Sequence, residues 1–146
     1  MIGEPIIRTG LVTCRLQRSE ALLELPPHHC GGFVVFEGST RSPDDKRVIE
    51  ALEYEAWETR TEAQLETIAL EVARKHDLGA AVILHRVGRV PAGDVAVIVA
   101  AAAAHRDAAF VAARELIDRT KTEAWIWKRE IGPAGEAWAD GCVDHD

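Results

Sequence analysis

Three short segments place basic side chains beside residues that form turns or helix ends. They read GSTR at 38–41, AHRD at 104–107 and KTEAWIWKRE at 121–130. Guanidinium and ammonium groups bind phosphate and carboxylate groups through charge-assisted hydrogen bonds. The three segments therefore indicate a site for an anionic substrate.

The first two segments each leave a second interpretation open. Arg41 follows Gly38, which ends an apolar run, and binding residues are often found on such loops. A solvated arginine is the alternative, because most arginine side chains are exposed. His105 and Arg106 stand at the expected start of a helix, where free N–H groups and the helix dipole favour an anion. Asp107 could instead balance the charge and leave His105 as a simple cap.

The third segment places two lysines around two tryptophans. We expect Lys121 to close a helix and Lys128 to lie on the following strand, so that the turn between them brings both ammonium groups to one pocket. A lysine near other cations, or partly desolvated, becomes a usable base or nucleophile. The alternative is that Lys121 complements a helix C-terminus and Lys128 is an exposed strand residue. Alternation along the strand would put Trp125, Trp127 and Arg129 on the face opposite Lys128.

The elements that must position these residues alternate between strand and helix patterns. Strands are predicted at 5–9, 31–38, 48–57, 80–90, 95–100, 123–130 and 136–142. Helices are predicted at 19–25, at 60–76 and from about His105 to Lys121. This order predicts an α+β fold of two layers, in one domain over residues 1–146.

The two long helices have apolar faces at helical spacing. The first helix should bury Leu65, Ile68, Ala69, Val72 and Ala73. The second should bury Ala109, Phe110, Ala113, Leu116 and Ile117. Two capping boxes are expected at the start of the first helix, Thr59 with Glu62 and Thr61 with Gln64. Gly79 is the candidate for the left-handed position after its end.

Composition excludes several classes of protein. The net charge of −7 argues against general nucleic-acid binding, so the cations must be gathered locally. No apolar run reaches 18 residues, so no membrane span is expected. The first residues lack the charged and then apolar layout of a signal peptide, which predicts a cytoplasmic protein.

The cysteines and histidines offer a competing interpretation. Cys14, Cys30 and Cys142 are odd in number and widely spaced, which argues against a disulfide framework and a zinc ribbon. His28, His29 and Cys30, together with His105, would be the ligands of a metal-dependent hydrolase. No second ligand pair at metal-binding spacing accompanies them, so no metal site is predicted.

Read in order, the segments GGFVVFEGSTR, LEYEAW, ILHRVGRVPAGD, AAHRDAAF and KTEAWIWKRE make this chain resemble the large, catalytic subunit of molybdopterin synthase over roughly residues 31–138. The resemblance implies an α/β hammerhead fold with a small additional β subdomain. It implies a homodimer within a heterotetramer, partnered by a small ubiquitin-like sulfur carrier that ends in a Gly-Gly thiocarboxylate. The implied reaction is sulfur transfer to cyclic pyranopterin monophosphate, forming the dithiolene of molybdopterin in molybdenum cofactor biosynthesis. No cofactor is expected.

The resemblance also assigns roles to residues. Lys128 would be the main catalytic group, activating the attack or holding an adduct with the carrier tail, and Lys121 would stabilise negative charge. Substrate contacts are implied at Ser39, Thr40, Arg41, His105, Arg106, Lys121, Lys128, Arg129 and Glu130. The chain departs from the family at Trp125, where proline is usual, and near Cys142, where a basic residue is common. These departures leave open a divergent homologue that binds the carrier without transferring sulfur.

Overall fold

The computed structural model describes residues 3–42 and 48–133, and the backbone of residues 135–138. Its elements, in chain order, are β1 Ile6–Val12, α1 Arg18–Ala21, β2 Gly32–Ser39, β3 Ala51–Ala56, α2 Glu58–Lys75, β4 Ala80–Arg86, β5 Gly88–Pro91, β6 Val95–Ala103, α3 Arg106–Glu123, β7 Ile126–Gly132 and β8 Gly135–Trp138. Within these described ranges, no helix combines the length and apolar character needed to cross a bilayer.

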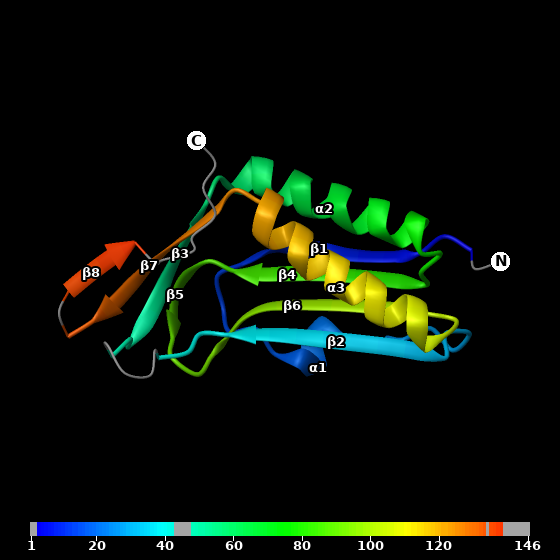
Figure 1. Ribbon diagram of the computed structural model, residues 1–146, viewed down its shortest axis with the longest axis horizontal. Helices are drawn as coiled ribbons and strands as arrows, with labels where there is room; N and C mark the ends of the chain where they lie inside the picture. The colour runs from blue at the N-terminus through cyan, green and yellow to red at the C-terminus, as the bar shows by residue number, and fades with distance from the viewer. Residues whose placement is uncertain (1–2, 43–47, 134, 139–146) are drawn as a thin grey trace.

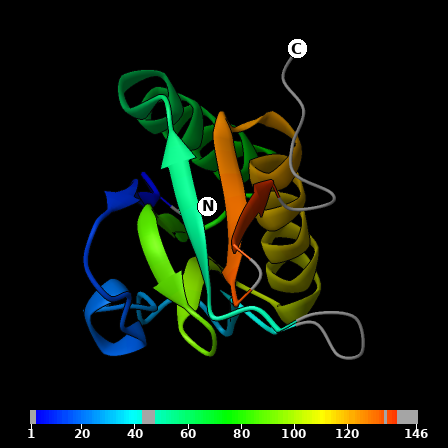
Figure 2. The same ribbon diagram turned by 90° about the vertical axis from the view of Figure 1, so that its left-hand side faces the viewer.

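The strands form two sheets of four. The larger sheet has the order β1-β4-β6-β2, with β1 parallel to β4 and the other pairs antiparallel. The smaller sheet is antiparallel, in the order β5-β3-β7-β8. Helices α2 and α3 cover one face of the larger sheet (Figure 1), and the smaller sheet stands at one end of these two layers (Figure 2). The predicted α+β fold is confirmed, and the smaller sheet is its additional β unit.

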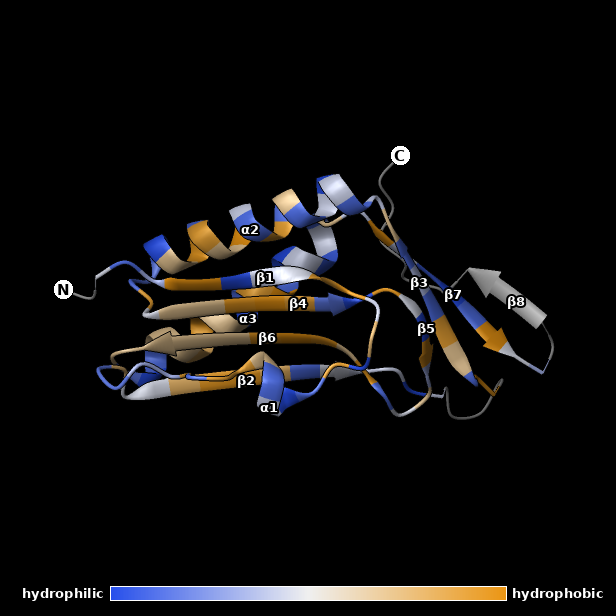
Figure 3. Cartoon of the chain, turned by 180° about the vertical axis from the view of Figure 1, so that it is seen from behind, coloured by the Kyte–Doolittle hydropathy of each residue, from blue (hydrophilic) through white to orange (hydrophobic). Residues whose placement is uncertain are grey.

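The main core lies between the larger sheet and the two long helices. All five residues predicted for the apolar face of α2 are buried there. Strands β4 and β6 are apolar along most of their length (Figure 3). Both of their faces are covered, because a second cluster around Leu16, Ala21 and Ile98 packs on the side away from the helices. Burial of each leucine or isoleucine of this core contributes about 1.5–3 kcal/mol.

Three predictions about the helices are wrong. Phe110 is 62% exposed, because it lies about 100° around α3 from Ala109, and Ala112 takes the inner position. Helix α2 begins at Glu58 with no side-chain cap, so neither predicted capping box forms. Asp77, and not Gly79, adopts the left-handed conformation, with φ at 52°.

Several strand boundaries differ from the predictions, because turns and pairing with distant strands set where these strands begin and end. The predicted strand at 80–90 is two strands, since Gly88, with φ at 88°, turns the chain between β4 and β5. Strand β6 continues to Ala103, because pairing with β2 and β4 on both sides outweighs the helix propensity of its alanines. The predicted helix at 19–25 is reduced to the single turn of α1. The last predicted strand extends beyond the described residues.

Candidate functional site at the junction of the two sheets

The two lysines lie on either side of the connection from α3 to β7. Lys121 is exposed on the last turn of α3, and Lys128 is half-buried as the third residue of β7. Helix α2 fixes the backbone between them. Thr61 Oγ1 donates to the Trp125 carbonyl oxygen at 2.9 Å, and Gln64 Oε1 accepts from the Trp125 N–H at 3.1 Å. The threonine and glutamine expected to cap α2 therefore hold the segment that carries the lysines.

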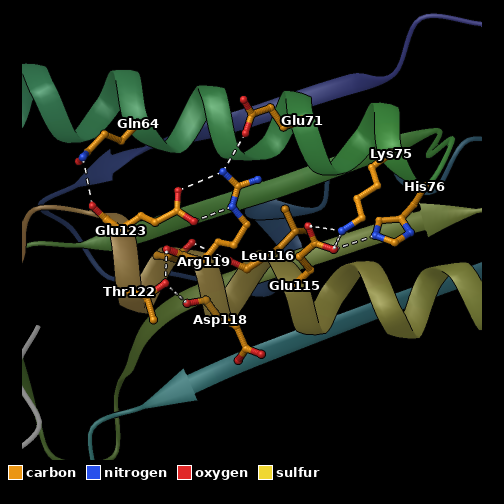
Figure 4. A network of polar contacts seen from close by, with 11 residues as sticks. Gln64, Glu71, Lys75, His76, Glu115, Leu116, Asp118, Arg119, Thr122 and Glu123 are labelled. Atoms are coloured by element: carbon orange, nitrogen blue, oxygen red, sulfur yellow. Dashed lines mark hydrogen bonds and ion pairs between the residues drawn. The ribbon is translucent and has the colours of Figure 1, made fainter.

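A network of polar contacts keeps α3 against α2 (Figure 4). The Arg119 guanidinium bonds Glu71 at 2.8 Å and Glu123 at 2.7 Å. Further along the helices, His76 Nε2 lies 2.9 Å from Glu115 Oε1, and this hydrogen bond is the main cause that lowers the pKa of Glu115. Each of these partly exposed pairs contributes no more than about 1 kcal/mol to the free energy of unfolding. Together they fix where the last turn of α3 presents its lysine.

A buried histidine links the two lysines. His85, near the end of β4, is 8% exposed, and its Nδ1 lies 2.8 Å from the Arg86 carbonyl oxygen. Its ring meets the Tyr54 ring edge to face, with centroids 4.9 Å apart. Burial lowers the pKa of His85 to about 4, and the positive charges of Lys121 and Lys128 act in the same direction. The positive charges of the lysine pair, Lys121 and Lys128, thus both act on one buried ring, where the larger sheet meets the smaller one.

The smaller sheet sorts the remaining residues of the third segment by face. Lys128 is the cross-strand partner of Tyr54, so the two side chains stand together on one face. Alternation puts Glu130 on that face and Arg129 on the other. Arg129 forms an ion pair with Glu55 there, at 2.6 Å. Of the two residues after Lys128, only Glu130 therefore faces the same side as the lysine pair.

The loop after β2 reaches the same end of the larger sheet. Ser39 and Arg41 are exposed, whereas Thr40 is 2% exposed. The Thr40 N–H donates to the Asp94 carbonyl oxygen at 2.9 Å, and Arg86 Nη1 donates to Asp94 Oδ2 at 3.2 Å. Asp94 thus ties the loop to the end of β4 that carries the buried histidine. The buried Thr40 hydroxyl has no hydrogen-bond partner among the described residues.

His105 and Arg106 lie at the opposite end of the larger sheet. Both are exposed, and His105 is the N-cap of α3 without a side-chain cap bond. Gly32, the first residue of β2, approaches so closely that an added Cβ would lie 3.0 Å from Arg106 Cα. Lys121 lies fifteen positions after Arg106 on α3, which is about 22 Å at 1.5 Å per residue. Within one chain, this pair is therefore not brought to the lysines.

The residues suggested for a metal-dependent hydrolase do not converge. In the part of the chain that the structure describes, no three His, Cys, Asp or Glu side chains are grouped to hold a metal ion. His28 and His29 contact each other edge to face at 5.8 Å. Cys30 packs so closely on Gly79 that an added Cβ would meet its sulfur, and burial raises the pKa of its thiol.

Two residues of the site, His85 and Tyr54, were not predicted from the sequence, although both lie in segments that carry the resemblance. A lone histidine closing the apolar run 80–84 was the available signal. The departure at Trp125 has a packing role, since its ring contacts Trp127 at 5.8 Å and lies under Arg60 at 4.9 Å. The departure near Cys142 lies outside the described residues.

Comparison with known proteins gives consistent matches. A family model described as MoaE protein matches residues 12–123. A protein of rice (Oryza sativa subsp. indica) named molybdopterin synthase catalytic subunit is 39% identical over 110 residues, covering 75% of this chain and 57% of the relative. The chain thus spans little more than half the length of that relative. A protein of the same name from Pyrococcus abyssi is 33% identical over 122 residues, covering 84% of this chain and 82% of its own.

Solved structures share the fold. Molybdopterin synthase from Staphylococcus aureus superposes with a TM-score of 0.83 at 31% identity, covering 89% of this chain and 95% of that one. A complex of subunits 1 and 2 of molybdopterin-converting factor from Helicobacter pylori gives a TM-score of 0.76 over 90% of each chain. At 20% identity, the second likeness shows the fold alone.

Proposed function

The chain belongs to the MoaE protein family, and on that premise we propose that it is the catalytic subunit of a molybdopterin synthase, acting in molybdenum cofactor biosynthesis in the cytoplasm. It transfers sulfur from the C-terminal thiocarboxylate of a small ubiquitin-like carrier, ending in Gly-Gly, to cyclic pyranopterin monophosphate. The product is the dithiolene of molybdopterin. The observation that carries this proposal is the position of Lys128, which is half-buried on β7 beside Tyr54, whose ring contacts the buried ring of His85.

The lysine pair suits a reaction between two anions. A thiocarboxylate and a cyclic phosphate repel each other, and two adjacent ammonium groups offset that repulsion. Lys128 is half-buried beside Tyr54, and we assign it the main catalytic role, activating the attack or holding an adduct with the carrier tail. Lys121, on the exposed last turn of α3, seats the thiocarboxylate and stabilises the developing negative charge.

The loop after β2 is assigned to the phosphate and the pterin. Arg41 is exposed on a loop that Asp94 fixes in place, and its planar guanidinium can bind phosphate with two hydrogen bonds. The exposed Ser39 hydroxyl is a further donor beside it, whereas the burial of Thr40 gives that residue no such support. Glu130 lies on the same face of β7 as Lys128, and this position supports a substrate contact for Glu130. The ion pair of Arg129 on the opposite face gives that residue no such support.

A homodimer supplies the remaining cations. His105 and Arg106 lie about 22 Å along α3 from Lys121 of the same chain, too far to share one substrate with it. A two-fold axis repeats each contact in both directions, so an α3 N-terminus placed at the lysine pair of the other copy would complete two sites. We therefore assign these two residues to the site of the second copy. One carrier bound at each site gives the heterotetramer.

Reconstitution tests the function. The purified chain is mixed in stoichiometric amount with thiocarboxylated carrier and cyclic pyranopterin monophosphate, and the dithiolene product is measured by mass spectrometry. We expect two sulfurs to enter each substrate molecule. Lys128→Ala should abolish the product and Lys121→Ala should reduce it strongly, whereas Lys75→Ala, at a lysine 63% exposed on α2, is the matched control. Absence of product with the unaltered chain would sink the proposal and favour a homologue that only binds the carrier.

A further inference from the structure

Two tryptophans close one end of the ladder between β3 and β7. Trp57 directly follows β3, and Trp125 directly precedes β7. The Trp57 N–H donates to the Trp125 carbonyl oxygen at 3.3 Å, so the two residues add one step beyond the last strand pair. Their rings meet edge to face, with centroids 6.1 Å apart. The pairing of the two strands is thus continued to the point where the chain enters α2 (Figure 2).

Arg60 places a charge against both rings. Its guanidinium carbon lies 4.9 Å from the centroid of the Trp125 ring and 5.5 Å from that of the Trp57 ring. The faces of indole rings attract cations at such distances. Arg60 is the third residue of α2, where the positive end of the helix dipole disfavours a cation. The two rings offset this local cost, and we call Trp57, Arg60 and Trp125 the tryptophan cluster.

Helix α2 holds the backbone of Trp125 as well as its ring. Thr61 Oγ1 donates to the carbonyl oxygen of Trp125 at 2.9 Å, and Gln64 Oε1 accepts from its N–H at 3.1 Å. The apolar face of α2 is itself buried in the main core. The residue that leads into β7 is therefore tied to the main core through its N–H, its carbonyl oxygen and its side chain.

The place of Trp125 decides where Lys128 stands. Lys128 follows it by three residues, about 10 Å along the chain, and is the cross-strand partner of Tyr54. A slip of one residue between β7 and β3 would turn every side chain of β7 to the opposite face, and Lys128 would leave the side of Tyr54. Alternation puts Trp125 and Trp127 on the face opposite Lys128, so the cluster can act on the lysine only through the strand.

We propose that the tryptophan cluster positions Lys128: by holding Trp125 against Trp57, it keeps β7 in register with β3, so that Lys128 stands opposite Tyr54. Arg60 and the two tryptophans are positioning residues, because they act through the strand and not on the reacting atoms. The consequence for catalysis rests on the proposed function, whereas the role of the cluster in the strand register does not.

Two substitutions of Arg60 separate its charge from its packing. Arg60→Lys keeps a cation, whereas Arg60→Met keeps an unbranched side chain of similar helix propensity without the charge. If the side chain only packs on the rings, or if the helix dipole decides, Met should replace Arg at least as well as Lys. If the charge holds the rings, Lys should replace Arg better than Met.

Native-state hydrogen exchange, followed by NMR, measures the cluster directly. The Trp57 amide reports the end of the ladder, and the Gly79 amide, which donates to the Ala102 carbonyl oxygen at 2.8 Å at the far end of the larger sheet, is the internal reference. We expect Arg60→Met to raise the exchange rate of Trp57 relative to Gly79 about fivefold, the effect of losing the cation–π contacts. Cross-strand NOEs between Tyr54 and Lys128 should weaken in the same variant.

Arg60→Lys should leave both the exchange ratio and the NOEs near those of the unaltered chain. Equal exchange ratios in the Met and Lys variants would overturn the proposal. Should Arg60→Met not fold, Trp57→Leu, at a side chain that is 55% exposed, gives the same contrast against Trp57→Phe, which keeps an aromatic face.

Sulfur transfer gives the second measurement. Arg60→Met should lower kcat about fivefold with KM for the pterin little changed, because the Arg41 loop is intact, and Arg60→Lys should restore most of kcat. An exchange contrast with kcat unchanged in both variants would overturn the link to Lys128, since a cluster that only stabilises the fold gives that result.

The two proposals fail in different ways. No dithiolene from the unaltered chain refutes the proposed function, and the exchange contrast still decides the role of the cluster in the strand register. Dithiolene formation with no exchange contrast refutes the role of the tryptophan cluster alone.

Discussion

Acidification from pH 7 to pH 5 should weaken the fold through His85. The folded protein holds this ring neutral with a pKa of about 4, against 6.5 for an ordinary histidine. The unfolded chain therefore binds the proton first as the pH falls below 6.5, so the contribution of His85 is present above that pH and is lost on the way to pH 4. The linkage relation gives a loss of about 2 kcal/mol between pH 7 and pH 5, and about 3 kcal/mol in full.

Urea unfolding at pH 7, 6 and 5 measures this loss as a change in the free energy of unfolding. The control is His85→Gln, which keeps a neutral polar side chain and every other titrating group, including Glu115 with its lowered pKa. We expect the unaltered chain to lose about 2 kcal/mol more than the variant over this range. Equal losses in the two proteins would show that the ring is not held neutral in the folded state, and the argument from its burial would be refuted.

Three further predictions concern the cations of the site and the support beneath them. Arg41→Ala should raise KM for the pterin substrate about tenfold with little change in kcat, because it removes one phosphate contact, and steady-state kinetics checks this. Lys128→Ala and Arg106→Ala, each inactive alone, should together recover about a quarter of the activity when co-expressed, since half of the dimers are mixed and each mixed dimer has one intact site; no recovery would contradict the shared site. Thr61→Val removes the hydrogen bond to the carbonyl between the lysines and should lower the free energy of unfolding by about 1 kcal/mol more than the exposed control Thr59→Val, as measured by urea unfolding.

The sequence predicted well those elements that bury a single apolar face, because the spacing of their apolar residues reveals that face. Helix α2 buries the five residues that its 3.6-residue period predicts. The predictions were wrong where contacts with a distant strand or helix determine the length of an element or the partner of a side chain. The alanines at 100–103 extend β6 because two neighbouring strands pair with them, and Thr61 and Gln64 bond a segment some sixty residues away in place of their own helix. No local pattern contains those partners.

The candidate site divides in the same way. The connection between Lys121 and Lys128 is local, so their places on the last turn of α3 and on β7 were predictable. Their common neighbour His85 comes from another sheet, so the sequence indicated it only as a polar residue at the end of an apolar strand. The predicted length of the helix already implies the separation of Arg106 from Lys121, because a straight helix of that length cannot bring both of its ends to one substrate.

The topology explains why the lysines, the Arg41 loop and His85 meet. Strands β2 and β4 both run toward the smaller sheet, and α3 runs back in the same direction after β6. The C-terminal ends of these three elements therefore lie at the same end of the larger sheet (Figure 1). Each of these elements carries a candidate functional residue just before or after its end. On a chain with a net charge of −7, cations collected at one edge create a local positive field that the rest of the surface does not share. Under the proposed function, this field would draw an anionic substrate and an anionic carrier tail to the same place, and a neutral, buried histidine near the two lysines adds no further cation to the repulsion between them.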